Sequence, residues 1–168
     1  SIAGGFGKVV LGENDGVGEN FGIAAMDLIA EETLSNVASS TISTNSDISQ
    51  GAGDNIKLAY FLPAMGGFTA GISHADSGAT TGTDTTTYGA QYTMDAGGNT
   101  VTVGGASSTT EVSDAIDTDS QNMGLKVVSG NLSVIVSQGT YEAVDEDRNT
   151  QGISASYKLA NGMVLGAF

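Results

Sequence analysis

The side chains of this chain that could do chemistry are mostly carboxylates. Among 168 residues there are 19 Asp and Glu against 5 Lys and Arg, with one histidine and no cysteine, and the formal net charge is −14. This acidity argues against a nucleic-acid partner, because phosphate contacts need clustered Lys and Arg. The absence of cysteine excludes disulfides, thiol catalysis and thiolate metal sites.

Two groups of carboxylates are crowded in the sequence. Asp145, Glu146 and Asp147 are consecutive, and three more aspartates lie between residues 114 and 119. Like charges at such spacing repel, and a divalent cation held by carboxylate oxygens would relieve the repulsion, so the first group is a candidate calcium site. Neither group has the spacing of an EF-hand loop. Calcium is the one cofactor that the sequence suggests.

No catalytic arrangement is recognisable in the sequence. His74 stands alone, far from any Gly-x-Ser-x-Gly motif, and we interpret it as a residue at a strand end. Gly16-Val17-Gly18 lacks both the strand-to-helix context and the following Lys-Ser/Thr of a phosphate-binding loop. The sequence therefore predicts that the protein is not an enzyme.

Most of the chain alternates between apolar and polar residues with a period of two, which is typical of β-strands. Short turns such as Asn161-Gly162 separate some of these segments, and long polar connections separate others, at residues 76–85, 107–120 and 141–149. This pattern predicts an all-β, up-and-down antiparallel sheet with nearly all of its carboxylates at one end. Nine strands are expected, at residues 4–12, 55–62, 68–73, 87–94, 100–103, 122–127, 132–136, 153–159 and from 162 onward.

Each expected strand has one apolar face and one face of small polar residues. A soluble sandwich would usually show many charges on its polar face, whereas small neutral residues suit the wall of a water-filled tube. No apolar run reaches the ~18 residues of a transmembrane helix, and a mean hydropathy of +0.02 fits a transmembrane barrel. The polar face carries four of the five basic residues, Lys8, Lys57, Lys126 and Lys158.

The longest interruption of the pattern is Asn14 to Asp54. A connection of about forty residues is uncommon in a compact domain and is often functional. Apolar residues between Phe21 and Leu34 have roughly helical spacing and predict a short helical turn. On composition alone, a solvated surface loop fits this stretch as well as a functional loop does.

The stretch Gly4 to Gly16 (GGFGKVVLGENDG), followed by a long loop and by Gly53 to Tyr60, resembles part of the Gram-negative general porins. It is similar to their strand, third loop and returning strand, closest to the α-proteobacterial type. Gly152 to Leu159 with its Asn-Gly turn looks like an ordinary porin hairpin. In that family a sixteen-stranded β-barrel forms a homotrimer in the outer membrane, among lipid and lipopolysaccharide, and passes small hydrophilic solutes and ions.

The resemblance implies that residues 1–168 are part of one porin barrel and that residues 14–54 are its constriction loop, folded into the pore. Asp27, Glu31 and Glu32, near the centre of the loop, would form the acidic half of an eyelet. The lumen-facing lysines would face them, since this chain lacks the family's clustered arginines. Because acidic residues outnumber basic ones, a preference for cations is expected.

Nine strands are an odd number and too few for a porin-sized lumen, so we expect an internal fragment that runs from the fifth strand to the thirteenth. Alternatively, Phe168 is a true terminal phenylalanine, although a strand that starts at Gly162 is short for a membrane span. Two other functions remain open. One is a secreted, acidic, β-rich surface or adhesin module that acts by binding. The other is a sugar-specific channel, for which Phe61 is the one aromatic residue found on the polar face.

Overall fold

The computed structural model describes residues 1–25, 28, 56–76, 83–112 and 116–167. These residues form ten β-strands and one short helix, α1 (Val17–Phe21). The strands are β1 (Ile2–Gly4), β2 (Gly7–Glu13), β3 (Ile56–Phe61), β4 (Phe68–Asp76), β5 (Thr83–Asp95), β6 (Asn99–Val112), β7 (Ile116–Ser129), β8 (Leu132–Ala143), β9 (Glu146–Lys158) and β10 (Val164–Ala167).

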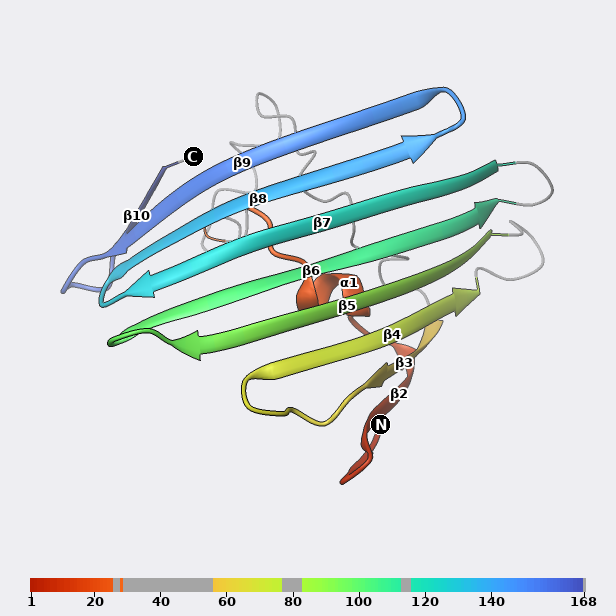
Figure 1. The fold of residues 1–168 in the computed structure, drawn as a ribbon, viewed down its shortest axis with the longest axis horizontal. Helices are drawn as coiled ribbons and strands as arrows, with labels where there is room; N and C mark the ends of the chain where they lie inside the picture. Colours follow the sequence, from red (N-terminus) through yellow and green to blue (C-terminus); the bar gives the residue numbers. More distant parts are fainter. Residues whose placement is uncertain (26–27, 29–55, 77–82, 113–115, 168) are drawn as a thin grey trace.

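The strands lie side by side in one antiparallel sheet in chain order, β1 to β10 (Figure 1). The predicted all-β, up-and-down architecture is therefore confirmed. The sheet is not closed, because within the described residues β1 pairs only with β2 and β10 only with β9. The described part of the chain contains no helix that is long and apolar enough to cross a membrane.

The predicted first strand is a hairpin. β1 and β2 pair from Ile2↔Val9 to Gly4↔Gly7, with the reversal at residues 5–6. Gly7 has a φ of 109°, and a Cβ at this position would collide with the backbone oxygen of Phe61. Only glycine tolerates this conformation at such a close approach, so the chain can reverse here and the sheet has ten strands where nine were expected.

Several strands are longer than their apolar alternation suggests. Segments 107–120 and 141–149 were predicted as long connections, but β6 and β7 extend through most of the first, and β8 and β9 through all but residues 144–145 of the second. Their Thr, Ser and Asn residues keep the period of two, and Thr140 pairs in register with Asn149. Threonine suits a pleated strand as well as a loop, and pairing with long neighbours decides between the two.

The apolar face of the sheet is exposed. One row of apolar side chains runs in register across six strands, and its members are between 37% and 63% exposed. A sandwich would have buried this row against a second layer, and the described residues form a single sheet. The row consists of Phe68, Tyr92, Val103, Leu125, Val136 and Ile153.

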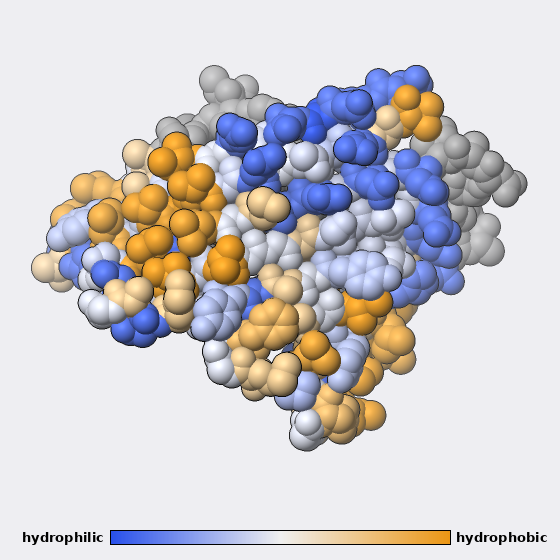
Figure 2. Space-filling model, viewed as in Figure 1, coloured by the Kyte–Doolittle hydropathy of each residue, from blue (hydrophilic) through white to orange (hydrophobic). Residues whose placement is uncertain are grey.

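The apolar side chains form a band that crosses the strands obliquely. Figure 2 shows them gathered at the left, over the ends of β6 to β9 near the turns at residues 96–98, 130–131 and 159–163, with hydrophilic side chains toward the opposite ends. On β4 and β5 the band reaches Ile72 and Tyr88, in register with Ser107, Gln121 and Thr140 on the next three strands. A membrane-facing band has this slant because barrel strands are tilted by about 35–45°.

Candidate functional site

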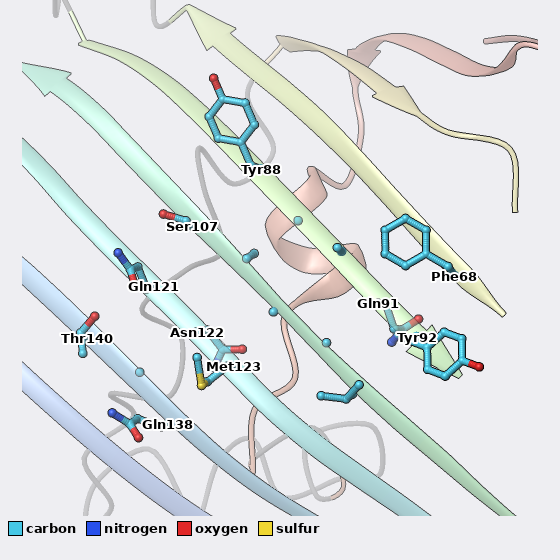
Figure 3. A pocket seen from close by; sticks show the side chains of 17 residues that line it. Phe68, Tyr88, Gln91, Tyr92, Ser107, Gln121, Asn122, Met123, Gln138 and Thr140 are labelled. Atoms are coloured by element: carbon cyan, nitrogen blue, oxygen red, sulfur yellow. The ribbon is translucent and has the colours of Figure 1, made fainter. Parts of the chain in front are cut away.

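The polar face of the sheet carries the first part of the long connection. α1 packs against β4, β5 and β6, and the residues that follow it contact β7, β8 and β9. Figure 3 looks at the apolar face and shows α1 behind the strands, on the side away from Tyr88 and Met123. Up to Ala25, the connection therefore lies over the polar face.

α1 is a single helical turn, closed at its start by a side chain. The carboxylate of Glu19 accepts a hydrogen bond from the backbone N of Gly16 at 2.8 Å, and Asn20 N donates to Gly16 O at 3.2 Å. An acidic residue at the third helical position pairs with the N-cap backbone in this way in many helices. The sequence predicted a helical turn between Phe21 and Leu34. The turn at Val17–Phe21 lies before that stretch, and within the stretch Leu28 is helical. Of residues 21–34, those from 26 on lie outside the described residues except Leu28.

Three buried side chains of the polar face accept hydrogen bonds from the backbone of the connection; we call this face, on strands β2 to β9, the wall. Buried backbone N–H groups need a partner, so each acceptor fixes one point of its path over the sheet. The pairs are Val17 N with Ser73 Oγ on β4 at 3.2 Å, Ile23 N with Asn122 Oδ1 on β7 at 2.8 Å, and Ala25 N with Ser137 Oγ on β8 at 2.9 Å. None of these acceptors was singled out from the sequence, because Ser and Asn occur at many positions of the chain.

Lys57 on β3 holds the start of the connection. Its side chain is 2% exposed, and its Nζ donates a hydrogen bond to the backbone oxygen of Asn14 at 2.7 Å. A Cβ placed on Gly16 would touch the aliphatic stem of the lysine at 3.5 Å. A buried ammonium group needs such partners, because burying an unpaired charge is costly.

All five basic residues lie on the face that carries the connection. Lys8 pairs in register with Phe61, whose ring packs against Phe21 of α1 with centroids 5.9 Å apart. The register places the other predicted lysines there too, because paired and alternate strand residues share a face. They are Lys57, which pairs with Ala75, Lys126, which pairs with Ile135, and Lys158, an even number of residues from the buried Ser154.

Arg148 is the basic residue that the sequence reasoning missed. It lies on β9, pairs in register with Tyr141 and stacks over that ring, with its guanidinium carbon 4.5 Å from the ring centroid. Its place in a predicted connection concealed it. The period of two that links Arg148 to Thr150, Gly152 and Ser154 is the signal that would have placed it on the polar face.

The carboxylates of the strands gather at one end of the sheet, as predicted. Most of them form two cross-strand rows on the side of the apolar face. The first row is Asp76, Asp84, Glu111 and Asp117, and the second is Asp119, Glu142 and Asp147. The predicted eyelet residues Asp27, Glu31 and Glu32 lie outside the described residues.

The predicted calcium ligands do not converge on a common point. Asp145 lies in a turn, while Glu146 and Asp147 are consecutive residues of β9 and so point to opposite faces. Glu146 forms an ion pair with Arg148, with Oε1 and Nε 2.9 Å apart. Nowhere in the described ranges do three His, Cys, Asp or Glu side chains form a group that could hold a metal ion.

An open groove of about 640 Å³ lies on the apolar face, at the border of the apolar band. Figure 3 shows the rings of Tyr88 and Tyr92 on one side of it and the amides of Gln121 and Gln138 on the other. Between these rows the groove is lined by the small residues Ala90 and Gly105. It lies on the side away from α1, so it is separate from the polar face.

Comparison with known proteins gives one family. A family model described as Gram-negative porin matches residues 1–168, which is the whole of the chain. Neither the curated proteins nor the solved structures contain a significant match.

Proposed function

The chain belongs to the Gram-negative porin family, and on this basis we propose that it lines an outer-membrane channel through which small hydrophilic solutes and ions diffuse. The family is located in the outer membrane, and its strands are transmembrane strands of a β-barrel. The observation that carries the proposal is the contrast between the faces of the sheet. The exposed apolar band suits lipid, and the face with small polar and basic side chains suits a hydrated passage.

The alternative of a secreted adhesin module is not favoured. A soluble module would have to cover the apolar row that includes Leu125 and Ile153, because soluble monomers rarely expose apolar patches of this extent. These two side chains are 42% and 63% exposed. A sugar-specific channel is not favoured either. On the polar face of the described strands, Phe61 of β3 contacts Phe21 of α1, and the other aromatic residue, Tyr141 of β8, is five strands away, so the two do not form an aromatic track.

We further propose that residues 14–54 are the constriction loop of this channel. The support is that Asn14 to Ala25 lies on the polar face, held by Lys57 and by the three wall acceptors. Asp27, Glu31 and Glu32 then supply the acidic half of the eyelet, and the basic residues of the wall supply the other half. Opposite charges on loop and wall would set up a field across the passage.

The same distribution of charge leads us to propose cation preference. Seven carboxylates lie between residues 15 and 54, against five basic residues in the whole chain. Further carboxylates line the rim in the two cross-strand rows. A narrow passage with an excess of one sign concentrates counter-ions of the other sign.

Reversal potentials test both proposals. The complete barrel is reconstituted in planar bilayers under a KCl gradient, and a potential of cation-selective sign is expected. Neutralising three loop carboxylates should move the reversal potential toward zero. A control variant that neutralises three carboxylates on the apolar face of the rim should move the potential less, although it removes the same charge. The loop triple is Asp27→Asn, Glu31→Gln and Glu32→Gln, and the control triple is Glu111→Gln, Asp117→Asn and Asp119→Asn.

Each result of this measurement has a definite meaning. A zero or anion-selective potential in the native channel would contradict cation preference. Equal shifts in the two triple variants would contradict the assignment of the loop while leaving the channel itself intact. Absence of any conductance would contradict the proposed function.

The stretch from Gly4 to Gly16 resembles part of the general porins, and this resemblance supports a finer proposal. We propose that the protein is a sixteen-stranded homotrimer of the α-proteobacterial type, among lipid and lipopolysaccharide. Sedimentation of the complete protein in detergent, with the bound detergent subtracted, should give three times the mass of one chain. A monomeric mass at all detergent concentrations would contradict the trimer.

A further inference from the structure

We propose that the sheet beneath the connection sets how far residues Gly16–Ala25 project into the passage. Two kinds of wall residue do this: glycines that let the segment approach closely, and the side-chain acceptors that hold it there. The conductance test below rests on the proposed function, whereas the packing can be tested without it.

The segment touches the wall at glycines. A Cβ at Gly89 would lie 2.8 Å from Val17 Cγ1, and one at Gly104 would lie 2.8 Å from the backbone oxygen of Phe21. Carbon atoms that are not bonded are normally about 3.5–4.0 Å apart. A single methyl group at either position would therefore displace the segment or the wall.

The same relation continues along the segment. A Cβ at Gly124 would lie 2.5 Å from the backbone oxygen of Ile23, and one at Gly152 would lie 2.7 Å from Ala25 Cβ. Glycine inside a strand weakens it, and it often marks a place where another backbone comes close. Here the segment that comes close is buried, since Val17 is fully buried and Ile23 is 3% exposed.

The glycines follow the path of the segment from strand to strand. Gly89 is on β5, Gly104 on β6, Gly124 on β7 and Gly152 on β9. On β8 the position paired with both Gly124 and Gly152 is Ser137, which is the acceptor for Ala25 N. The wall thus combines contact points and hydrogen-bonding points along one continuous track from β4 to β9.

An added methyl group would displace the segment and leave the wall in place. The glycines at 89, 104 and 124 lie on inner strands that pair along their length with a neighbour on each side. Val17, Ile23 and Ala25 are held by single side-chain acceptors. The segment would therefore move away from the wall, toward the open passage, and narrow it.

The acceptors have the opposite role. Removing the side chain of Asn122 or Ser137 leaves the backbone N–H of Ile23 or Ala25 without its partner. The segment is then no longer tied down at that point, and it can fluctuate in the passage. Glycine variants and acceptor variants are thus expected to have different electrical signatures.

The first experiment compares single-channel conductance in the complete barrel. Gly104→Ala and Gly124→Ala should each lower the conductance. The matched control is Ser133→Thr, which also adds one methyl group to the polar face. Ser133 lies on β8, four residues from Ser137 and next to the turn at residues 130–131. Unchanged or raised conductance in both glycine variants would overturn the inference.

The second experiment compares the noise of the open channel. Asn122→Ala and Ser137→Ala should increase current fluctuations, and Ser133→Ala on the same face should not. Equal noise in the Ser137 and Ser133 variants would overturn the holding role of the acceptors.

A cross-link tests the packing without any channel measurement. The chain has no cysteine, so Ala25→Cys with Gly152→Cys introduces one pair. Their Cβ positions are 2.7 Å apart, about 1 Å closer than the usual disulfide spacing, so the segment moves outward by about that much and stays within bonding reach. Oxidation should link the pair in the folded protein, and adding Gly124→Ala should reduce the yield.

No link in the folded double variant would overturn the inference, even if the protein conducts. A link without conductance would overturn only the proposed function. Circular dichroism shows whether each glycine variant folds. If either Gly104→Ala or Gly124→Ala does not fold, the other variant is used in its place.

Discussion

Lys57 is a charged side chain that is almost fully buried in the described structure. Its Nζ donates to the backbone oxygen of Asn14 at 2.7 Å, and its stem runs beside Gly16. It therefore joins the sheet to the connection at the point where the connection leaves β2. At this scale the polar face is a set of specific anchors as well as a hydrated surface.

Replacing Lys57 by methionine keeps the length of the side chain and removes its donor. We expect a loss of about 1–3 kcal/mol of folding free energy, because the Asn14 carbonyl loses a charged partner in a buried place. Urea unfolding in detergent measures this loss of folding free energy. Lys158→Met, at an exposed position on the same face, is the control and should change stability by less than about 0.5 kcal/mol. Equal losses in the two variants would argue against the anchoring role.

Gly7 determines the hairpin that the sequence pattern did not reveal. Gly7→Ala combines a left-handed conformation, which costs an L-residue about 1–2 kcal/mol, with a collision against Phe61 O. Gly130→Ala is the matched control, because its φ is 57° and it has open space around it. We expect the Gly7 variant to unfold at clearly lower urea concentration than the Gly130 variant. The same midpoint for both would contradict the close approach to β3.

At the scale of strands, the carboxylate rows are a source of repulsion. Glu111 on β6 is paired in register with Asp84 on one side and Asp117 on the other. Like charges directly opposite each other on neighbouring strands destabilise a sheet. Strand pairing therefore prevails here over local electrostatics, and the rim keeps a concentrated negative charge.

Neutralising the middle member of the row should stabilise the sheet. Glu111→Gln is expected to gain about 0.2–1 kcal/mol, because two repulsive pairs disappear at once. The gain should shrink when salt is added, since exposed charges are screened. Asp95→Asn, at the last residue of β5 and the other end of the sheet, is the control, and thermal unfolding at low and high salt is the measurement. A gain that does not depend on salt would exclude repulsion as its cause.

At the scale of the whole molecule, the slant of the apolar band relates the sheet to the membrane. Leu125 and Gln121 lie on the same face of β7, four residues apart, yet only Leu125 belongs to the row of apolar residues that spans six strands. If the band is in contact with lipid, a charge on it must enter hydrocarbon, whereas a charge beyond it stays at the polar end of the strand.

Leu125→Arg should therefore reduce insertion of the complete barrel into lipid vesicles and destabilise it by about 2–4 kcal/mol. Gln121→Arg places the same charge beyond the band and should have little effect. Insertion yield, measured by flotation of vesicles with bound protein, tests the pair of variants. Equal insertion of both would mean that the band does not mark the membrane.

The sequence by itself determined the period, the faces and the end that carries the charge. Alternation at Leu125, Val127 and their neighbours predicted the strands and the exposed apolar face, because a side-chain period of two follows from strand geometry alone. The tight turns and the lysines of the polar face follow from the same local information. The family resemblance in Gly4–Gly16 agrees with the family match over the whole chain.

Only the tertiary structure decided the lengths of the strands, the extra hairpin and the path of the connection. Polar residues such as Thr109 and Asn149 suit loops and strands equally, so their conformation depends on neighbours that are distant in sequence. Arg148 reached the polar face for the same reason. The glycine track could not be predicted, because contact between Ile23 and Gly124 joins residues about a hundred positions apart, and a glycine in a sequence does not reveal which backbone will come close to it.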